Sequence, residues 1–186
     1  MTSRIETLAL VYQACWHALA AATSTRGHNF KRLGLATVNG DTADLRTVVL
    51  REVQADTQQL LFFTDARSPK VAQITAHPNA TLMAWCGQLG WQLRLRVVLT
   101  VQTSGLAVSS RWARLKLTPA AQDYMSPLPP GALLGTQAQH QPERASRAHF
   151  AVVTAQVQAI DWLELHASGH RRALFDAAGQ GRWVTP

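Results

Sequence analysis

The segment from Arg46 to Lys70 gathers hydroxyl and cationic side chains around two apolar runs. Thr64 ends the second run, and Ser68 and Lys70 follow in a Ser-Pro-Lys turn that opens a helical pattern. The first turn of a helix presents free backbone N–H groups and the positive end of the helix dipole, so it suits an anion. Arg46, on the preceding strand, can bind a phosphate with two hydrogen bonds. The alternative is that Ser68 only caps the helix and that the cations face water.

A later strand carries a second row of polar side chains. Within WQLRLRVVLTVQ, residues 91–102, alternation puts Gln92, Arg94 and Arg96 on one face and apolar side chains on the other. Such a row suits a bound anion or cofactor. It is equally what a face turned to solvent would show.

Periodicity and turn signals predict the elements that position these residues. The first three strands follow one another through short turns, which predicts an antiparallel meander. Strands are predicted at residues 32–38, 43–53, 59–64, 79–85, 91–102 and 150–165, with a terminal hairpin at 170–186. Helices are predicted within residues 1–25 and at 68–77 and 106–117. The pattern predicts a mainly β protein with peripheral helices, in which six to seven antiparallel strands form a closed or nearly closed barrel.

Composition limits the kind of protein and its partners. The 186 residues suit a single domain, 1–186, with residues 118–148 as a long loop rich in Pro, Gln, Ser and Gly. The net charge of +7 favours anionic partners, but the basic residues form no run, which disfavours nucleic acid. Cys15 and Cys86 suggest free buried thiols and hence a cytoplasmic protein. The N-terminal apolar stretch is too short to span a membrane, and the seven histidines show no metal-ligand spacing.

Four motifs in this order, RTVVLR, FFTDARSPKVAQI, NATLMAW and WQLRLR, give the chain a specific likeness. Together they resemble the pyridoxamine 5'-phosphate oxidase-like FMN-binding family, with a weaker similarity in IDWLELHASGHRR. The similarity runs from about residue 34 to about residue 99. The resemblance implies a split β-barrel, a homodimer, and two FMN sites at the subunit interface.

The resemblance also implies roles for individual residues. Arg46, the Phe63–Thr64 pair, Ser68 and Lys70 match the residues at the FMN phosphate and ribityl chain. The strand backbone after Arg46 matches the segment along the flavin, and a cation and a glutamine further on match residues beside the ring. A late arginine matches either Arg171 or Arg172. The implied cofactor-binding residues are Arg46, Thr47, Val48, Val49, Leu50, Arg51, Phe63, Thr64, Ser68, Lys70, Gln92 and Arg172.

Two departures from the family pattern matter. Pro69 stands where the family often has a phosphate-binding arginine, and Arg67 is the neighbouring cation that could replace it. The stretch at 112–131 lacks a recognisable form of the Tyr, Arg and Ser that hold the substrate phosphate in the true oxidases. FMN binding therefore carries over better than the substrate does.

The sequence thus predicts an FMN-dependent oxidoreductase of unknown substrate, with no catalytic side chain assigned. A non-catalytic module that binds or senses FMN is the first alternative. A basic barrel that binds nucleic acid is the second, and it predicts binding that weakens steeply with salt.

Overall fold

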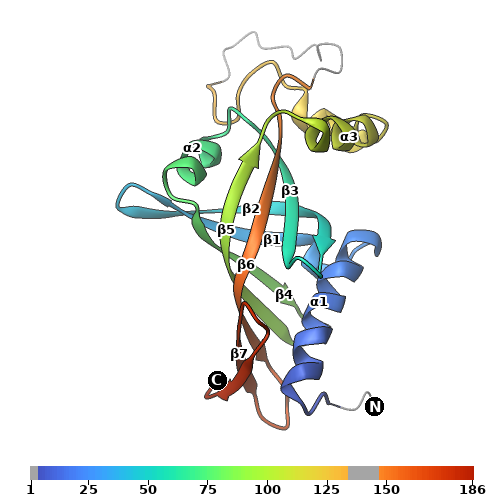
Figure 1. Cartoon of the computed structure of the whole chain (residues 1–186), viewed down its shortest axis with the longest axis vertical. Helices are drawn as coiled ribbons and strands as arrows, with labels where there is room; N and C mark the ends of the chain where they lie inside the picture. Colours follow the sequence, from blue (N-terminus) through green and yellow to red (C-terminus); the bar gives the residue numbers. More distant parts are fainter. Residues whose placement is uncertain (1–3, 134–146) are drawn as a thin grey trace.

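The computed structural model describes residues 4–133 and 147–186, in which eight antiparallel strands form one continuous sheet (Figure 1). The strands are β1 Arg32–Asn39, β2 Thr42–Gln54, β3 Gln59–Asp65, β4 Asn79–Cys86, β5 Trp91–Gln102, β6 Phe150–Glu164, β7 Arg171–Asp176 and β8 Gly181–Val184. The helices are α1 Leu8–Ser24, α2 Pro69–Ala76 and α3 Leu106–Leu115, with 3₁₀ helices η1 Asn29–Lys31 and η2 Pro119–Tyr124.

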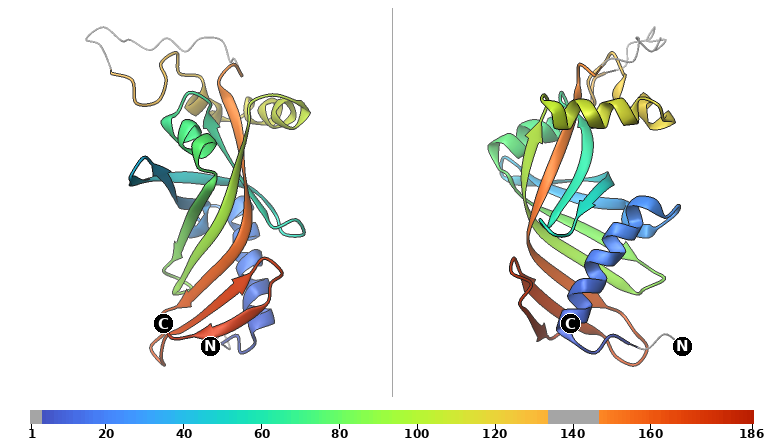
Figure 2. Two further views of the ribbon diagram at one scale, coloured as in Figure 1. Left: turned by 60° about the vertical axis from the view of Figure 1, so that its left-hand side comes forward. Right: turned by 45° about the vertical axis from the view of Figure 1, so that its right-hand side comes forward.

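Six of these strands pair in a ring. The sheet order is β3-β2-β1-β4-β5-β6-β7-β8, and an additional pairing of β3 with β6 closes the first six strands on themselves. β7 and β8 continue the sheet beyond the ring and lie at the end of the molecule opposite α2 and α3 (Figures 1 and 2). The result is a split-barrel arrangement with helices at its periphery, as the sequence predicted.

The long strand β6 explains why the ring is split. Its 15 residues pair with β5 along one edge. Along the other edge, Phe150–Gln156 pair with β3 and Ala159–Glu164 pair with β7. A bulge lies between these two stretches, where Val97 pairs with Val157 and Arg96 pairs with Ala159. Because a bulge bends a strand and increases its twist, β6 leaves β3 at this point and joins β7.

The core fills the ring and extends beneath α1. The buried residues of α1 are Val11, Cys15, Trp16, Leu19 and Ala22, which confirms the apolar helical face read from the sequence. Figure 2 shows α1 running beside the ring toward the end that carries β7 and β8. A smaller apolar cluster packs α3 and η2 against the outside of β3 and β6, around Trp112 and Phe150.

The predicted elements are recovered with small shifts at their ends. The strands number eight rather than six to seven, because the terminal hairpin adds two strands outside the ring. Within 118–148, the described residues contain η2 and no other helix or strand, and residues 134–146 of the predicted loop lie outside the described residues. No helix in the described part of the chain is both long and apolar enough to cross a membrane.

Candidate functional site

The side chains predicted to meet at an anion gather at one end of the ring, where α2 follows β3. This group, termed the cation cluster, consists of Arg46 from β2, Thr64 from β3, and Ser68 and Lys70 at the start of α2. Local sequence brings the last two into place, because Pro69 between them fixes a helical φ at the first helical position. Thr64 and Ser68 are each 5% exposed, so the cluster is partly buried and not a solvated surface.

The ammonium group of Lys70 rests on two neutral hydroxyls. It donates hydrogen bonds to Oγ1 of Thr64 at 3.1 Å and to Oγ of Ser68 at 2.6 Å. The Ser68 side chain makes no capping hydrogen bond to α2, so the alternative that it only caps the helix is wrong. Its oxygen serves the lysine instead.

No carboxylate of the described residues pairs with Lys70. The acids that act on it electrostatically, Asp44 and Asp65, form ion pairs with Arg46 and Arg67. Burial lowers the pKa of Lys70, and the charge of Arg46 lowers it further, against a smaller opposing effect of the two acids. The charged form of Lys70 is therefore disfavoured in the free protein, and an added anion would stabilise it.

Two residues that the motifs did not single out hold the side chain of Arg46. Nη2 of Arg46 donates to Oε1 of Gln73 at 2.7 Å and lies 2.5 Å from Oδ2 of Asp44. Gln73 is buried; it also accepts from the Thr37 hydroxyl at 2.6 Å and donates to Asp44 at 2.9 Å. The spacing of Asp44, two residues before Arg46 on one strand, could have predicted that the two side chains lie on one face. No sequence pattern could have predicted the contact of Gln73, because a polar residue within a short helix normally faces water.

Arg67, the cation that could replace the phosphate-binding arginine displaced by Pro69, is bound to other groups in the structure. Its guanidinium is bound to the carboxylate of Asp65, with Nη2 at 2.7 Å from Oδ2. The same group donates to the carbonyl oxygens of Ser126 at 2.8 Å and Pro127 at 3.0 Å. Arg67 therefore ties the segment after η2 to the turn before α2, and its donors are already used.

The remaining predicted cofactor residues lie on two other surfaces. Val48 and Leu50 point into the core, so only their backbone can face a ligand. Thr47 points outward, and cross-strand pairing links it through Gly34 and Met83 to Arg94. Arg94 shares the outer face of β5 with Gln92. The shared outer face predicted for Gln92, Arg94 and Arg96 is confirmed, since the residues between them are buried.

The two candidates for the late arginine have different surroundings. Arg171 binds Glu164 and the carbonyl oxygen of Ile5, and its guanidinium lies over the rings of Trp162 and Trp183. Arg172 binds Asp161 on the outer face, where it shares a cross-strand row with Leu163 and Gln92. Of the two, only Arg172 lies on the face of Gln92.

Arg51 and Phe63 lie away from the cation cluster, on the side of β2 and β3 that α3 covers. Nη2 of Arg51 lies 3.5 Å from the hydroxyl of Tyr124, and its guanidinium carbon lies 5.8 Å from the centre of the Phe63 ring. A cavity of about 190 Å³ adjoins them, lined also by Arg111 and Arg114. The stretch in which the resemblance implied substrate contacts therefore lies beside Arg51.

The donors of the cation cluster suit a phosphate group. They are two hydroxyls, one ammonium group with no counter-ion among the described residues, and one guanidinium held by an amide and a carboxylate, all able to donate to anionic oxygens. A metal would need different ligands. Among residues 4–133 and 147–186, no three His, Cys, Asp or Glu side chains are grouped to hold one.

Comparison with known proteins agrees with these motifs. Residues 13–103 match the family model described as pyridoxamine 5'-phosphate oxidase, FMN-binding domain, which confirms the resemblance stated from the sequence. This range covers most of α1, all of β1 to β5, and α2. No protein of curated function matches the chain in sequence.

Solved structures share the fold over nearly the whole chain. A pyridoxamine 5'-phosphate oxidase-related, FMN-binding protein from Nostoc punctiforme is 26% identical over 94% of this chain and 96% of its own, with a TM-score of 0.78. PhzG from Burkholderia lata, solved with tetrahydrophenazine-1-carboxylic acid, is 16% identical over 95% and 92%, with a TM-score of 0.72. General Stress Protein 26 from Bacillus anthracis is 10% identical over 80% and 92%, with a TM-score of 0.55. At these lower identities, the last two share the fold alone.

Proposed function

We propose that this chain, whose residues 13–103 match an FMN-binding domain, binds FMN by its phosphate at the cation cluster and is an FMN-dependent oxidoreductase. The observation that carries the proposal is the ammonium group of Lys70, held on two neutral hydroxyls beside Arg46 with no carboxylate partner among the described residues. FMN, when bound, supplies the two-electron redox chemistry that protein side chains lack. We take residues 1–186 to act as one domain.

Each residue of the cluster has a task in this proposal. Lys70 supplies a charge, and Thr64 and Ser68 supply hydroxyls that can turn from the lysine toward phosphate oxygens. Arg46 supplies a guanidinium that Gln73 already orients. Asp44 opposes the phosphate as a like charge, so Arg46 must be shared between the two anions.

Two further residues can serve the same FMN only from a second copy of the chain. Gln92 lies three strands from β2 in the sheet, and Arg172 also lies three strands away because β3 pairs with β6. At about 4.8 Å per strand, each separation is about 14 Å along the sheet, and both side chains face outward whereas Arg46 faces into the ring. The same outer face exposes Leu45, Met83 and Trp85, which are apolar and suited to an interface. We therefore propose a homodimer formed through this face, in which each chain completes the other's site.

Placing a charge on this face should separate the dimer. Met83 is 40% exposed in the single chain, so Met83→Glu leaves the core intact but places a carboxylate in the proposed interface. We expect a monomer in size-exclusion chromatography with light scattering, together with loss of bound FMN. Met83→Leu is the matched control and should remain dimeric. A dimeric Met83→Glu protein would rule out this face.

Gln73 should act on FMN through Arg46. Gln73→Leu removes the acceptor that orients the guanidinium and puts an apolar side chain of similar size in its place on α2. The loss of one hydrogen bond of about 1 kcal/mol predicts FMN binding weaker by about fivefold, measured by quenching of flavin fluorescence. Gln122→Leu, on the exposed side of η2, is the control and should bind as the wild type does. Equal affinities in both variants would contradict the positioning role.

FMN affinity should fall at alkaline pH earlier than an ordinary lysine would predict. Only protonated Lys70 attracts phosphate, and burial lowers the pKa of Lys70, so its charge is lost sooner as the pH rises. Dissociation constants measured from about pH 7 to about pH 9.5 should therefore increase across this range. Lys70→Arg keeps its charge throughout and should show a flatter profile. Identical profiles would show that the titrating group is not Lys70.

A visible absorption spectrum tests the proposal as a whole. The purified protein is measured, then measured again after FMN is added and the excess is removed. A retained flavin band near one FMN per chain is expected, followed by bleaching of the band under anaerobic conditions with a suitable donor. Retained flavin that no amine, alcohol or nicotinamide donor reduces would favour a non-catalytic module. A protein that retains no flavin would overturn FMN binding, and polynucleotide binding at low salt would then be examined.

A further inference from the structure

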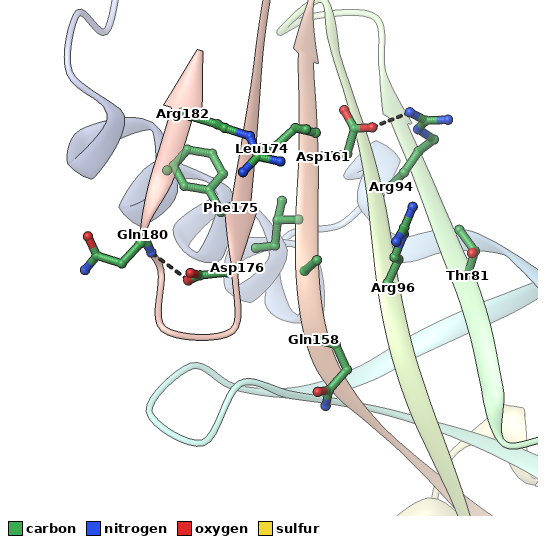
Figure 3. Close-up of a pocket in the computed structure, with 13 residues that line it drawn as sticks. Thr81, Arg94, Arg96, Gln158, Asp161, Leu174, Phe175, Asp176, Gln180 and Arg182 are labelled. Atoms are coloured by element: carbon green, nitrogen blue, oxygen red, sulfur yellow. Dashed lines mark hydrogen bonds and ion pairs between the residues drawn. The ribbon is translucent and has the colours of Figure 1, made fainter. Parts of the chain in front are cut away.

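The largest cavity described in the structure lies on the face proposed for the homodimer. It has a volume of about 570 Å³ and is formed on the outer side of β5, β6, β7 and β8 (Figure 3). Strand register explains it, because Ala159 of β6 pairs with Arg96 on one side and with Asp176 on the other. The methyl group of Ala159 leaves a hollow between these longer side chains. In a well-packed interface, such a hollow receives a projection of the partner chain.

Two arginines beside the hollow have no partner within one chain. Arg96 and Arg182 stand on opposite sides of the hollow in Figure 3. Neither makes a hydrogen bond or an ion pair with residues 4–133 or 147–186, whereas Arg94 is paired with Asp161. A dimer formed through this face would bring unpaired guanidinium groups from both copies together, and like charges disfavour association. The proposed dimer therefore needs an acidic group of the partner at this place.

The β1–β2 hairpin is the projection that the same face offers. β4 pairs with β1 only as far as Ala36, so residues 37–44 continue as a two-stranded ribbon, and Figure 1 shows this hairpin extending from the side of the ring. Its outer side is bare, since Val38 is 41% exposed and Leu45 is 68% exposed. A two-stranded ribbon is marginally stable in water by itself. A partner surface that covers its apolar side chains would stabilise it.

α2 holds the hairpin from its inner side. The buried side chain of Gln73 accepts from the hydroxyl of Thr37 on β1 at 2.6 Å and donates to Asp44 on β2 at 2.9 Å. Gln73 therefore joins both strands of the hairpin to the helix that begins at the cation cluster. A hairpin held in this way needs little further ordering when it enters a partner, which lowers the entropic cost of association.

The tip of the hairpin carries the acid that the cavity lacks. Asp41 lies in the turn between β1 and β2, is exposed, and makes no hydrogen bond or ion pair within the described part of the chain. Asp56 and Asp123 are also exposed and form no ion pair with a described residue, but they lie in the β2–β3 turn and in η2. Of these three acids, only Asp41 belongs to the hairpin that carries Leu45 of the proposed dimer face.

We propose that the β1–β2 hairpin of each chain enters the cavity of the partner chain. Asp41 then pairs with the partner's Arg96 and Arg182, and Val38 packs on the partner's Leu174. This pairing rests on the homodimer of the proposed function and identifies the segments that meet in it. An acid between two arginines neutralises charges that would otherwise oppose association, and it also fixes the register of the two chains.

Closed symmetry allows both hairpins to be seated at once. The hairpin strands β1 and β2 lie on one side of β4 in the sheet, and β5 to β8, which form most of the cavity, lie on the other. A twofold axis near Met83 of β4 therefore places each hairpin over the partner's cavity. The same arrangement brings β2, which carries Arg46, toward the partner's Arg172, whose cross-strand row adjoins that of Arg182.

Charge reversal tests the pairing. Dissociation constants of the full-length dimer are measured by analytical ultracentrifugation. Asp41→Arg alone and the double variant Arg96→Glu, Arg182→Glu should each weaken the dimer by about tenfold or more, because each places like charges together. The triple variant reverses both sides and should recover most of the loss. Asp56→Arg reverses an exposed acid of the β2–β3 turn and should dissociate as the wild type does.

Cross-linking provides a measurement that does not depend on affinity. Asp41→Cys chains are mixed with Arg182→Cys chains and treated with a short bis-maleimide, which links two nearby thiols. A covalent dimer is expected on a denaturing gel. Asp56→Cys chains mixed with Arg182→Cys chains are the matched control and should give none. The native cysteines, Cys15 and Cys86, are buried, so the wild type should also give none.

Two outcomes would overturn the proposal in a dimeric protein. One is a triple variant as weak as the two sets of reversals predict by simple addition, and the other is the absence of a cross-link between Asp41→Cys and Arg182→Cys chains. A monomeric wild type would overturn both this pairing and the homodimer on which it rests. FMN binding is measured separately from the absorption spectrum of each variant. A cross-linked dimer that retains no flavin would refute FMN binding and leave the pairing of hairpin and cavity supported.

Discussion

Replacing Lys70 or Arg46 by alanine is expected to weaken FMN binding by about tenfold or more in each case. A hydrogen bond to a charged group contributes about 1.5–3 kcal/mol, which corresponds to roughly 10- to 100-fold in affinity. The expectation is firmer for Lys70, because its ammonium group has only hydroxyl hydrogen-bond partners among the described residues and forms no ion pair with any of their carboxylates. Arg46 is already paired with Asp44, so Arg46→Ala should weaken FMN binding less than Lys70→Ala does.

The stability of these variants separates a binding role from a structural one. Burial lowers the pKa of Lys70, so the charged lysine is a cost to the free protein and Lys70→Ala should not reduce the free energy of unfolding. Lys116→Ala and Arg26→Ala remove exposed charges of the same kind and should leave FMN affinity unchanged. FMN titrations followed by flavin fluorescence measure all four variants. Unchanged affinity in both Lys70→Ala and Arg46→Ala would refute the site.

The largest expected loss of stability comes from Glu164→Ala. Glu164 is 7% exposed and accepts from Arg4 at 2.6 Å, from Arg171 at 2.9 Å and from the indole N–H of Trp91 at 3.4 Å. Removing the carboxylate leaves Arg171, which is mostly buried, without its main counter-ion. Breaking a buried pair in this way costs about 3 kcal/mol or more. Urea unfolding should show a lower midpoint with an unchanged slope.

Glu6→Ala provides the matched comparison. Glu6 is also paired with Arg171, at 3.8 Å, but it is 76% exposed, so its removal should change the free energy of unfolding by less than about 0.5 kcal/mol. Glu164→Gln keeps the shape and part of the hydrogen bonding and should lie between the two. Similar midpoints for Glu6→Ala and Glu164→Ala would show that the buried carboxylate is not a main support of the β6–β7 junction.

Much of the local structure could be predicted from the sequence because it depends on neighbours along the chain. Alternation with a period of two placed Gln92 on the same face as Arg94 and Arg96. Helical spacing identified the buried face of α1. The Ser-Pro-Lys turn located the start of α2, where Ser68 and Lys70 lie. Each of these signals spans a few residues, and backbone geometry alone fixes what such neighbours can reach.

The composition of the site beyond that turn depended on the tertiary structure. Gln73 meets Arg46 only because α2 packs across the end of the ring. Arg67 is bound to other groups because the segment after η2 folds back against the turn before α2 and accepts hydrogen bonds from its guanidinium. Adjacent residues in one strand, Arg171 and Arg172, differ in role because β6 offers Glu164 to one and Asp161 to the other.

The sequence by itself therefore determined the strands, their faces and a turn of the kind that suits a phosphate group, whereas only the tertiary structure decided which distant side chains complete each site. The closing pairing of β3 with β6 and the sharing of β6 between β3 and β7 have no local signature. Pairing between strands far apart in the chain is selected by the burial of the whole core, and a shift of one residue in register would turn every side chain of a strand to the other face.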